Sequence, residues 1–225
     1  IIKLRILNSE LFFFANPYER PDEMDEESMY AEAKVMADDT GTLGPRNVWY
    51  GNFFPDMRAW DKLDPFRGRG AGGHVVFIQF AGSPMWCHMS VFPAKTYKKA
   101  HRHGPGRAIV IPGGEGYSIM WQEGQEKVVV DWHEASLFTP PGGWFHQHFN
   151  VGGTPGRYLA LHPMHQFAGH SEKVADRARD QIEYPQEDPW IREKFEGEMA
   201  KRNLTSIMPD GAYRDLNFEW DYGKE

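Results

Sequence analysis

Histidines gather in the middle of this 225-residue chain, and their spacing is the first indication of chemistry. All ten lie between residues 74 and 170. The stretch KKAHRHGPGRAIVIPGGEGYSIMW contains His101 and His103, and the later stretch PPGGWFHQHFN contains His146 and His148. Residues two apart in a strand point to the same face of a sheet. Each pair would therefore present two imidazoles side by side.

Imidazole nitrogen is a common ligand of zinc, iron, copper and nickel. Two ligands do not make a functional metal site, so a third must come from elsewhere in the chain. We expect it from the second histidine pair, because two strands of a small closed barrel can meet in its interior. The histidines therefore predict a metal site inside a β-barrel.

Short β-rich runs separated by Gly and Pro turns recur from residue 73 to residue 163. Several short strands at regular spacing are typical of an antiparallel sandwich or barrel. The turn sequences EGQE and VGGT indicate hairpins. The expected strands lie in HVVFIQFAG, MWCHMSVFPA, RAIVIPGG, GYSIMWQEG, KVVVDW, ASLFTPPGG, WFHQHFNVGG and RYLALHP.

The segment before these strands predicts one short helix and a loop. Residues 24–39 are acidic and place Met29, Ala33 and Met36 at helical spacing. Residues 40–72 look irregular because Gly and Pro recur every few positions. We expect the aromatic side chains of this loop to pack it onto the main body; they are Trp49, Tyr50, Phe53, Phe54 and Trp60.

The segment after the strands predicts helix. Asp188 and Pro189 have the character of an N-cap and a first helical position. Apolar residues follow at i, i+4 and i+8, which predicts an amphipathic helix that ends near Asn203 and lies on the barrel; they are Ile191, Phe195 and Met199. A second helix is expected within residues 171–183.

Two blocks of this sequence resemble the two motifs of the cupin superfamily. The first is His101-Arg102-His103 followed by Gly114-Glu115-Gly116-Tyr117, and the second is Pro141-Gly142-Gly143-Trp144-Phe145-His146 with Asn150 four residues on. The resemblance covers residues 73–163. It implies a mainly β protein with one double-stranded β-helix, a jelly-roll barrel. The patterns of the flanking segments add helical extensions at residues 1–72 and 164–225 to this expected fold. It also implies that His101, His103 and His146 are metal ligands.

The sequence departs from the family at its fourth ligand, which is a glutamate. Arg107 occupies that position and Ala108 follows it, while Glu115 belongs to the Gly-Glu-Gly turn. Three neutral histidines leave a divalent metal with its full charge, which favours an anionic, chelating substrate. Arg107 either points inward and holds a substrate carboxylate, or faces solvent while Ala108 faces the barrel. His148 is a fourth ligand, an acid/base or a packed polar residue.

Cupins that lack the glutamate include gentisate-type and β-diketone dioxygenases, and the pattern here is most similar to the gentisate type. The resemblance implies an oxidoreductase that adds oxygen to a small anionic, metal-chelating substrate, aromatic or enolisable. Fe(II) is the expected metal, with Mn(II), Ni(II) or Zn(II) as alternatives. The alternative functions are a non-oxidative lyase, isomerase or hydrolase, and a non-catalytic ligand-binding or sensing cupin. Arg107 and His148 are the candidate catalytic residues.

The remaining candidates have a structural and a functional interpretation. His88 and His162 share strand faces with other expected inward residues and either line the pocket or pack in the core. Trp144 and Phe145 either fill the barrel or line a substrate, and Cys87 is expected to be a buried apolar residue. Surface or turn positions are expected for four histidines, His74, His133, His165 and His170.

Bulk composition excludes several classes of partner. The net charge is −7, which argues against nucleic acid and against anionic lipid. The apolar run ELFFFA near the start is too short to span a bilayer. A single cysteine cannot form an internal disulfide, so a cytoplasmic location is expected. We expect a homodimer that acts on a small molecule, with the long flanks available for an interface.

Overall fold

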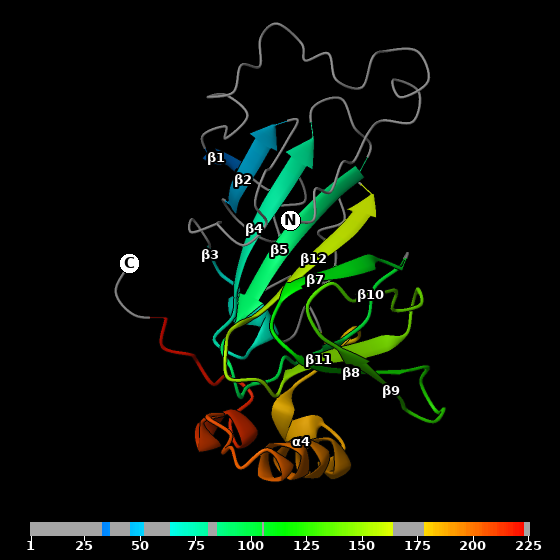
Figure 1. The fold of residues 1–225 in the computed structure, drawn as a ribbon, viewed down its shortest axis with the longest axis vertical. Helices are drawn as coiled ribbons and strands as arrows, with labels where there is room; N and C mark the ends of the chain where they lie inside the picture. The colour runs from blue at the N-terminus through cyan, green and yellow to red at the C-terminus, as the bar shows by residue number, and fades with distance from the viewer. Residues whose placement is uncertain are drawn as a thin grey trace, which may run out of the picture.

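The computed structural model describes residues 33–36, 46–51, 64–80, 85–104, 106–163 and 178–222. Eight consecutive strands form its centre (Figure 1). They are β5 (Met85–Phe92), β6 (Ala100–His101), β7 (Ala108–Gly113), β8 (Gly116–Trp121), β9 (Val128–Trp132), β10 (Leu137–Phe138), β11 (Phe145–Asn150) and β12 (Gly156–Pro163). Seven of the eight fall within or directly beside runs that the sequence predicted, whereas β6 lies between two of those runs. The remaining predicted run, HVVFIQFAG, contains β4 (His74–Phe80).

These strands alternate between two facing sheets. One sheet contains the order β5-β12-β7-β10 and the other the order β6-β11-β8-β9, and every one of these pairs is antiparallel. Strands that succeed one another in the chain therefore cross repeatedly between the sheets, which is the topology of a jelly roll. The predicted mainly β, jelly-roll fold is confirmed.

The two expected hairpins have different outcomes. The EGQE turn joins β8 to β9, which pair antiparallel, so this hairpin is present. The VGGT turn joins β11 to β12, which belong to different sheets. That prediction was wrong because a glycine-rich turn can equally carry the chain across the barrel from one sheet to the other.

Strands, not a helix, precede the barrel. Four strands extend the first sheet, with β2 parallel to β4 and the other pairs antiparallel. They are β1 (Ala33–Met36), β2 (Arg46–Gly51), β3 (Asp64–Pro65) and β4 (His74–Phe80), with the 3₁₀ turn η1 (Arg67–Arg69) between the last two. The helix expected over 24–39 is wrong at residues 33–36, and its remainder lies outside the described residues. Residues 46–51 are likewise a strand within the segment expected to be irregular, because pairing with a neighbouring strand overrides local propensity.

The C-terminal part begins with another strand. β13 (Gln181–Ile182) pairs with β6 at the edge of the second sheet, so the helix expected within 171–183 is wrong there. The 3₁₀ turn η2 (Tyr184–Gln186) and the helix α4 (Pro189–Lys201) follow, and η3 (Asp210–Tyr213) lies in the tail. The Asp188 side chain accepts a hydrogen bond from the Trp190 backbone nitrogen, which confirms the predicted N-cap. Within the described residues, no helix is long and apolar enough to cross a membrane.

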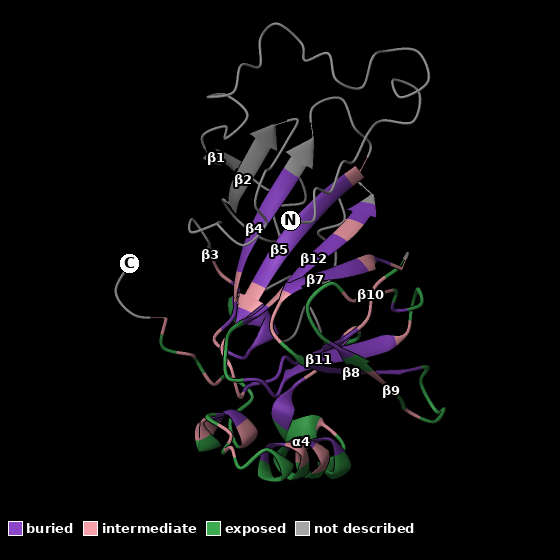
Figure 2. Ribbon diagram, viewed as in Figure 1, coloured by how far each residue is buried: buried purple, intermediate pink, exposed green. Residues whose placement is uncertain are grey.

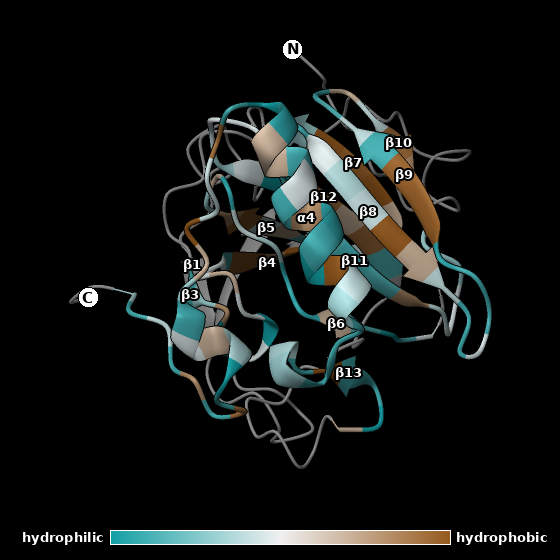
Figure 3. Ribbon diagram, turned by 90° about the horizontal axis from the view of Figure 1, so that it is seen from below, coloured by the Kyte–Doolittle hydropathy of each residue, from teal (hydrophilic) through white to brown (hydrophobic). Residues whose placement is uncertain are grey.

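Helix α4 covers the outer face of the second sheet (Figures 1 and 3). Its buried residues are the three predicted ones, Ile191, Phe195 and Met199. They belong to a cluster, here called the helix-side cluster, with Tyr97, Tyr117, Ile119, Trp121, Phe145 and Phe149 among its sheet members. Burying each large apolar side chain contributes roughly 1.5–3 kcal/mol. Strands β5, β7, β8 and β11 and the inner side of α4 are accordingly largely buried, while the opposite side of the helix and most of β9 are exposed (Figure 2).

Candidate metal centre

The structure brings together three of the predicted histidines. His101 on β6 and His146 on β11 are direct cross-strand partners, and His103 follows β6 by two residues. The ring centroids are 4.3 Å apart for His101–His146, 4.9 Å for His103–His146 and 5.6 Å for His101–His103. One potential ligand nitrogen from each ring lies within 4.8 Å of the others. This spacing lets three imidazoles converge on one ion.

A register shift directs His101 into the barrel. Tyr97 is bridged to Phe149, whereas His101 is the partner of His146, so four residues on one strand span the same distance as three on the other. Tyr97 packs outward in the helix-side cluster, and Lys98 points inward to Ser90 on the opposite sheet. Strict alternation would place His101 on the outer face together with Tyr97. The extra residue, a β-bulge, returns it to the inner face.

Backbone carbonyls orient two of the rings. Nδ1 of His146 lies 3.1 Å from the Trp144 carbonyl oxygen, and Nδ1 of His101 lies 3.3 Å from that of Lys99. A carbonyl accepts only, so each Nδ1 carries the proton and donates it. The unprotonated Nε2 of each ring is then the atom with a free lone pair. Metal-binding histidines commonly donate their second nitrogen in this way.

Burial keeps these imidazoles neutral. The pKa of His146 is lowered to about 3 by desolvation, with the charges of Arg107 and Arg69 acting in the same direction against its hydrogen bond to Trp144. The pKa of His101 is also held well below its ordinary value, first by desolvation and then by Arg69 and the neighbouring histidines. A neutral imidazole is the form that binds a metal ion.

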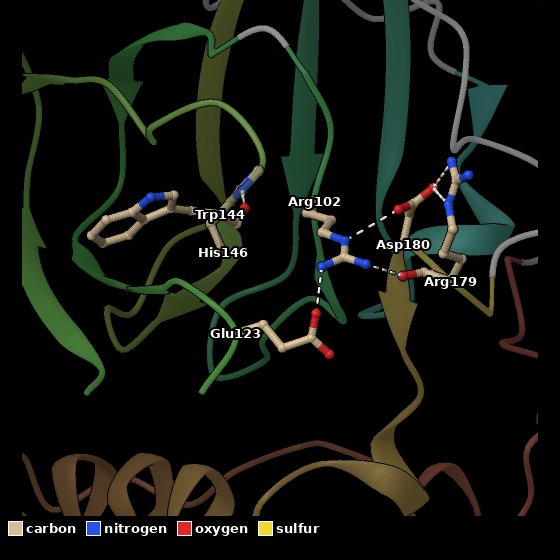
Figure 4. Close-up of polar contacts among 6 residues, drawn as sticks. All are labelled: Arg102, Glu123, Trp144, His146, Arg179 and Asp180. Carbon is tan, nitrogen blue, oxygen red and sulfur yellow. Dashed lines mark hydrogen bonds and ion pairs between the residues drawn. The ribbon is translucent and has the colours of Figure 1, made fainter. Parts of the chain in front are cut away.

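On the outer side, Arg102 anchors the segment between the two ligands of the first motif (Figure 4). Its guanidinium donates to Asp180 at 3.2 Å, to Glu123 at 2.8 Å and to the backbone oxygen of Arg179 at 3.0 Å. Its backbone nitrogen also donates to the Asp180 carbonyl at 2.8 Å. These partners come from two separate segments, so Arg102 ties the first histidine motif to the turn before β13 and to the turn between β8 and β9.

His148 shares the inner face of β11 with His146, and their ring centroids are 5.6 Å apart. Its Nδ1 lies 2.8 Å from the Ser118 hydroxyl, and that hydroxyl accepts a hydrogen bond from the Trp132 indole at 3.1 Å. The simplest assignment has Ser118 donate to His148, which leaves the proton of the neutral ring on Nε2. Desolvation, together with the charges of His146 and Lys98, holds the pKa of His148 well below its ordinary value.

Arg107 points into the protein. Only 4% of its surface is exposed, whereas Ala108 is half-buried, so the alternative that places Arg107 in solvent is wrong. Its charge lowers the pKa of His146 on one sheet and of His88 on the other. Burial lowers the pKa of Arg107 itself to about 10, which leaves the guanidinium charged at neutral pH. A permanent cation thus lies beside the histidine cluster.

A second histidine pair lies on the first sheet. His88 on β5 and His162 on β12 are both buried, and Nδ1 of the first lies 3.2 Å from Nε2 of the second. The His88 ring also approaches Phe77 and Tyr158, at centroid distances of 5.7 and 6.0 Å. These contacts place both rings on the inner face of the first sheet, where either the pocket or the packed role remains open.

The other candidates lie away from the centre. Phe145 faces outward, stacks on Trp121 and lies under Arg102, so it does not line the barrel. Glu115 is exposed and its carboxylate lies 3.9 Å from Arg202. Cys87 is buried among apolar side chains as expected. His133 is exposed and His74 half-buried, while His165 and His170 lie outside the described residues.

Polar residues that were not predicted from the sequence complete the interior. Lys98 is fully buried, donates to Ser90 at 2.5 Å and lies over the rings of Phe66, Phe92 and Tyr158 at 5.2 to 5.4 Å. Desolvation and then the charge of Arg69 lower its pKa to about 7. Lys98 is three residues from His101, but without knowledge of the bulge its orientation could not be predicted.

Comparison with known proteins yields structural matches only. No protein-family model matches the sequence, and no curated protein does. Similar solved structures include oxalate decarboxylase from Bacillus subtilis at pH 4.6, the Cnp3 cupin domain of Schizosaccharomyces pombe and the capsular polysaccharide assembling protein CapF from Staphylococcus aureus. Their identities are 13, 12 and 13%, and their TM-scores are 0.41, 0.39 and 0.39. The matches cover 51, 48 and 47% of this chain but 30, 66 and 32% of those chains. The structural neighbours thus include cupins, and this chain spans about a third of the length of two of the three.

Proposed function

We propose that this protein is a metal-dependent cupin enzyme in which His101, His103 and His146 hold one divalent ion. The observation that supports this most is the convergence of three imidazoles, two of them kept neutral by burial and oriented by backbone carbonyls. An ion held there would supply a Lewis acid and, as Fe(II), the redox chemistry that a dioxygenase requires. Fe(II) is the proposed metal, with Mn(II), Ni(II) or Zn(II) as alternatives.

The substrate we propose is a small anion that chelates the metal, aromatic or enolisable. Three histidine ligands leave the charge of the ion uncompensated, and Arg107 adds a buried positive charge beside them. Among the buried charged side chains of the described residues, four are cations and one is a carboxylate, Glu183, which pairs with Lys99 at 2.5 Å. The Arg107 guanidinium can hold a substrate carboxylate through two parallel hydrogen bonds.

His148 is proposed to act on the substrate rather than on the metal. Its Nδ1 is engaged by Ser118, and its protonated Nε2 is the atom available to donate a hydrogen bond. The link from Trp132 through Ser118 fixes the ring and its tautomer. In this role His148 orients a substrate oxygen and exchanges a proton with it.

Metal analysis of the purified protein tests the site. We expect about one bound ion per chain in the wild type and in His133→Ala, an exposed control, and a loss of that ion in His101→Ala and His146→Ala. Unchanged metal content in the last two variants would refute the ligand assignment.

Oxygen uptake by the Fe(II) form with catechols, gentisate and β-diketones tests the reaction. No uptake with any of them, together with substrate turnover, would indicate a non-oxidative enzyme; a ligand recovered unaltered would indicate a binding protein.

A further inference from the structure

A single carboxyl group connects the two histidine-bearing strands on their outer face. Glu187 lies between η2 and α4, and its Oε2 accepts a hydrogen bond from Gln147 Nε2 at 3.0 Å. Its Oε1 accepts a hydrogen bond from the Tyr97 hydroxyl. Gln147 lies between His146 and His148 on β11, and Tyr97 lies four residues before His101. Glu187 is therefore bonded to both strands at once.

These bonds lie where the backbone pairing of the two strands is irregular. The register changes between the Tyr97–Phe149 bridge and the His101–His146 pair. A bulge interrupts the ladder and bends the strand, so regular backbone hydrogen bonds alone do not fix the strand there. A side chain that spans both strands at this level supplies the missing constraint.

The carboxyl group is itself held firmly by its surroundings. The Glu187 backbone nitrogen donates to the Tyr184 carbonyl at 3.4 Å, and the Tyr184 hydroxyl donates to the Tyr97 carbonyl at 2.5 Å. The next residue, Asp188, caps α4, whose Phe195 packs against the Tyr97 ring with a centroid distance of 4.9 Å. The segment that presents Glu187 is thus attached to the same strand that it contacts.

We propose that Glu187 is a positioning residue for the metal centre, which by bonding Gln147 and Tyr97 fixes the relative placement of His146 and His101. The inference rests on the proposed function in so far as these histidines bind a metal. It assigns a role to the segment after the barrel, because that segment supplies a side chain that is hydrogen-bonded to both strands.

Three variants separate positioning from general stability. Glu187→Ala removes both bonds, and we expect it to weaken Mn(II) or Zn(II) binding about 10- to 100-fold, the usual cost of losing a group that supports a metal ligand. Glu187→Gln should stay within about 3-fold of wild type, because Gln147 Oε1, which has no hydrogen-bond partner among the described residues, can turn to accept from the new amide. Glu196→Ala is the matched control, since this exposed residue of α4 pairs with Arg192 and, among the described residues, forms no hydrogen bond or ion pair with either strand.

A second readout keeps the test independent of metal binding. In the metal-free protein, the imidazole ¹⁵N shifts of His146 and His101 should change in Glu187→Ala and remain as in wild type in Glu196→Ala and Glu187→Gln. If Glu187→Ala does not fold, Gln147→Met removes one of the two bonds and takes its place. Wild-type affinity together with wild-type ¹⁵N shifts in Glu187→Ala would overturn the inference. If the wild type binds no metal, the proposed function fails, and the ¹⁵N shifts still decide the role of Glu187.

Discussion

The two faces of β11 differ in what they contribute. Its inward residues are His146 and His148, which lie among other polar side chains in the barrel. Its outward residues include Phe149, which stacks between Tyr97 and Tyr117 at centroid distances of 4.8 and 4.5 Å under helix α4. The outer face therefore provides the apolar burial that stabilises the sheet, and it allows the inner face to carry polar groups that cost stability. Neighbouring residues of β11 therefore alternate between the polar side chains of the candidate site and the apolar side chains that stabilise the sheet.

Among the changes that test this difference between the two faces, the largest loss of stability is expected from a substitution on the outer face. Phe195→Ala removes a fully buried ring of α4 from the helix-side cluster and should lower the free energy of unfolding by about 3–5 kcal/mol. Metal affinity, measured where the variant is still folded, should change far less than in His146→Ala. Urea unfolding and metal titration measure the two quantities. A variant with normal stability would show that the helix is not the main support of this sheet.

The histidines of the inner face should add to the free energy of unfolding of the protein only when metal is bound. At a free metal concentration of about 100 times the dissociation constant, the wild type should be stabilised by about 2.7 kcal/mol. His146→Ala should show no such gain, while His133→Ala should behave as the wild type. Thermal unfolding with and without chelator measures this. An equal gain in His146→Ala would mean that the ion binds elsewhere.

Glu187 is expected to make a contribution of intermediate size to the free energy of unfolding, and this contribution should depend on pH. Desolvation raises its pKa from 4.5 to about 7, against hydrogen bonds from Tyr97 and Gln147 and the charge of Arg192, while Asp188 adds to the rise. The folded protein thus binds more protons than the unfolded chain between pH 4.5 and 7. The stability due to this group is fully present below about pH 4.5 and is lost as the pH rises through 7.

Glu187→Gln, which cannot ionise, is the direct comparison for this pH dependence. The stability of the wild type relative to Glu187→Gln should fall by roughly 2–3 kcal/mol between pH 4.5 and 8. Urea unfolding at a series of pH values measures the difference. A difference that stays constant or rises over this range would contradict a raised pKa.

The smallest change in the free energy of unfolding is expected from substitutions at the start of α4. Asp188→Ala removes the N-cap bond to Trp190 and an exposed pair with Lys127, and it should cost about 1 kcal/mol. Asp188→Asn keeps the cap and should cost only a few tenths of a kcal/mol. Chemical denaturation distinguishes them. Equal losses in the two variants would indicate that the ion pair with Lys127, and not the cap, stabilises the helix.

Local features of the molecule were predictable because their causes are local. The strands of the barrel follow from alternating apolar runs between Gly and Pro turns. Helix α4 follows from the Asp188–Pro189 start and the spacing of Ile191, Phe195 and Met199, and the structure confirms all of them. The predictions that failed concern residues 33–36, 46–51 and 181–182 and the VGGT turn. At these places partners distant in sequence decide whether the chain forms a strand, or which sheet it joins.

The spacing of the histidines can be read from the sequence alone, and it sets which side chains share a face of β11. Only the tertiary structure decided that His101 and His146 become direct partners, that Arg107 points inward and that Glu187 bonds both strands. The reason is physical: the period of a strand is a property of the local backbone, whereas strand register, a bulge and burial depend on contacts between segments 40 or more residues apart.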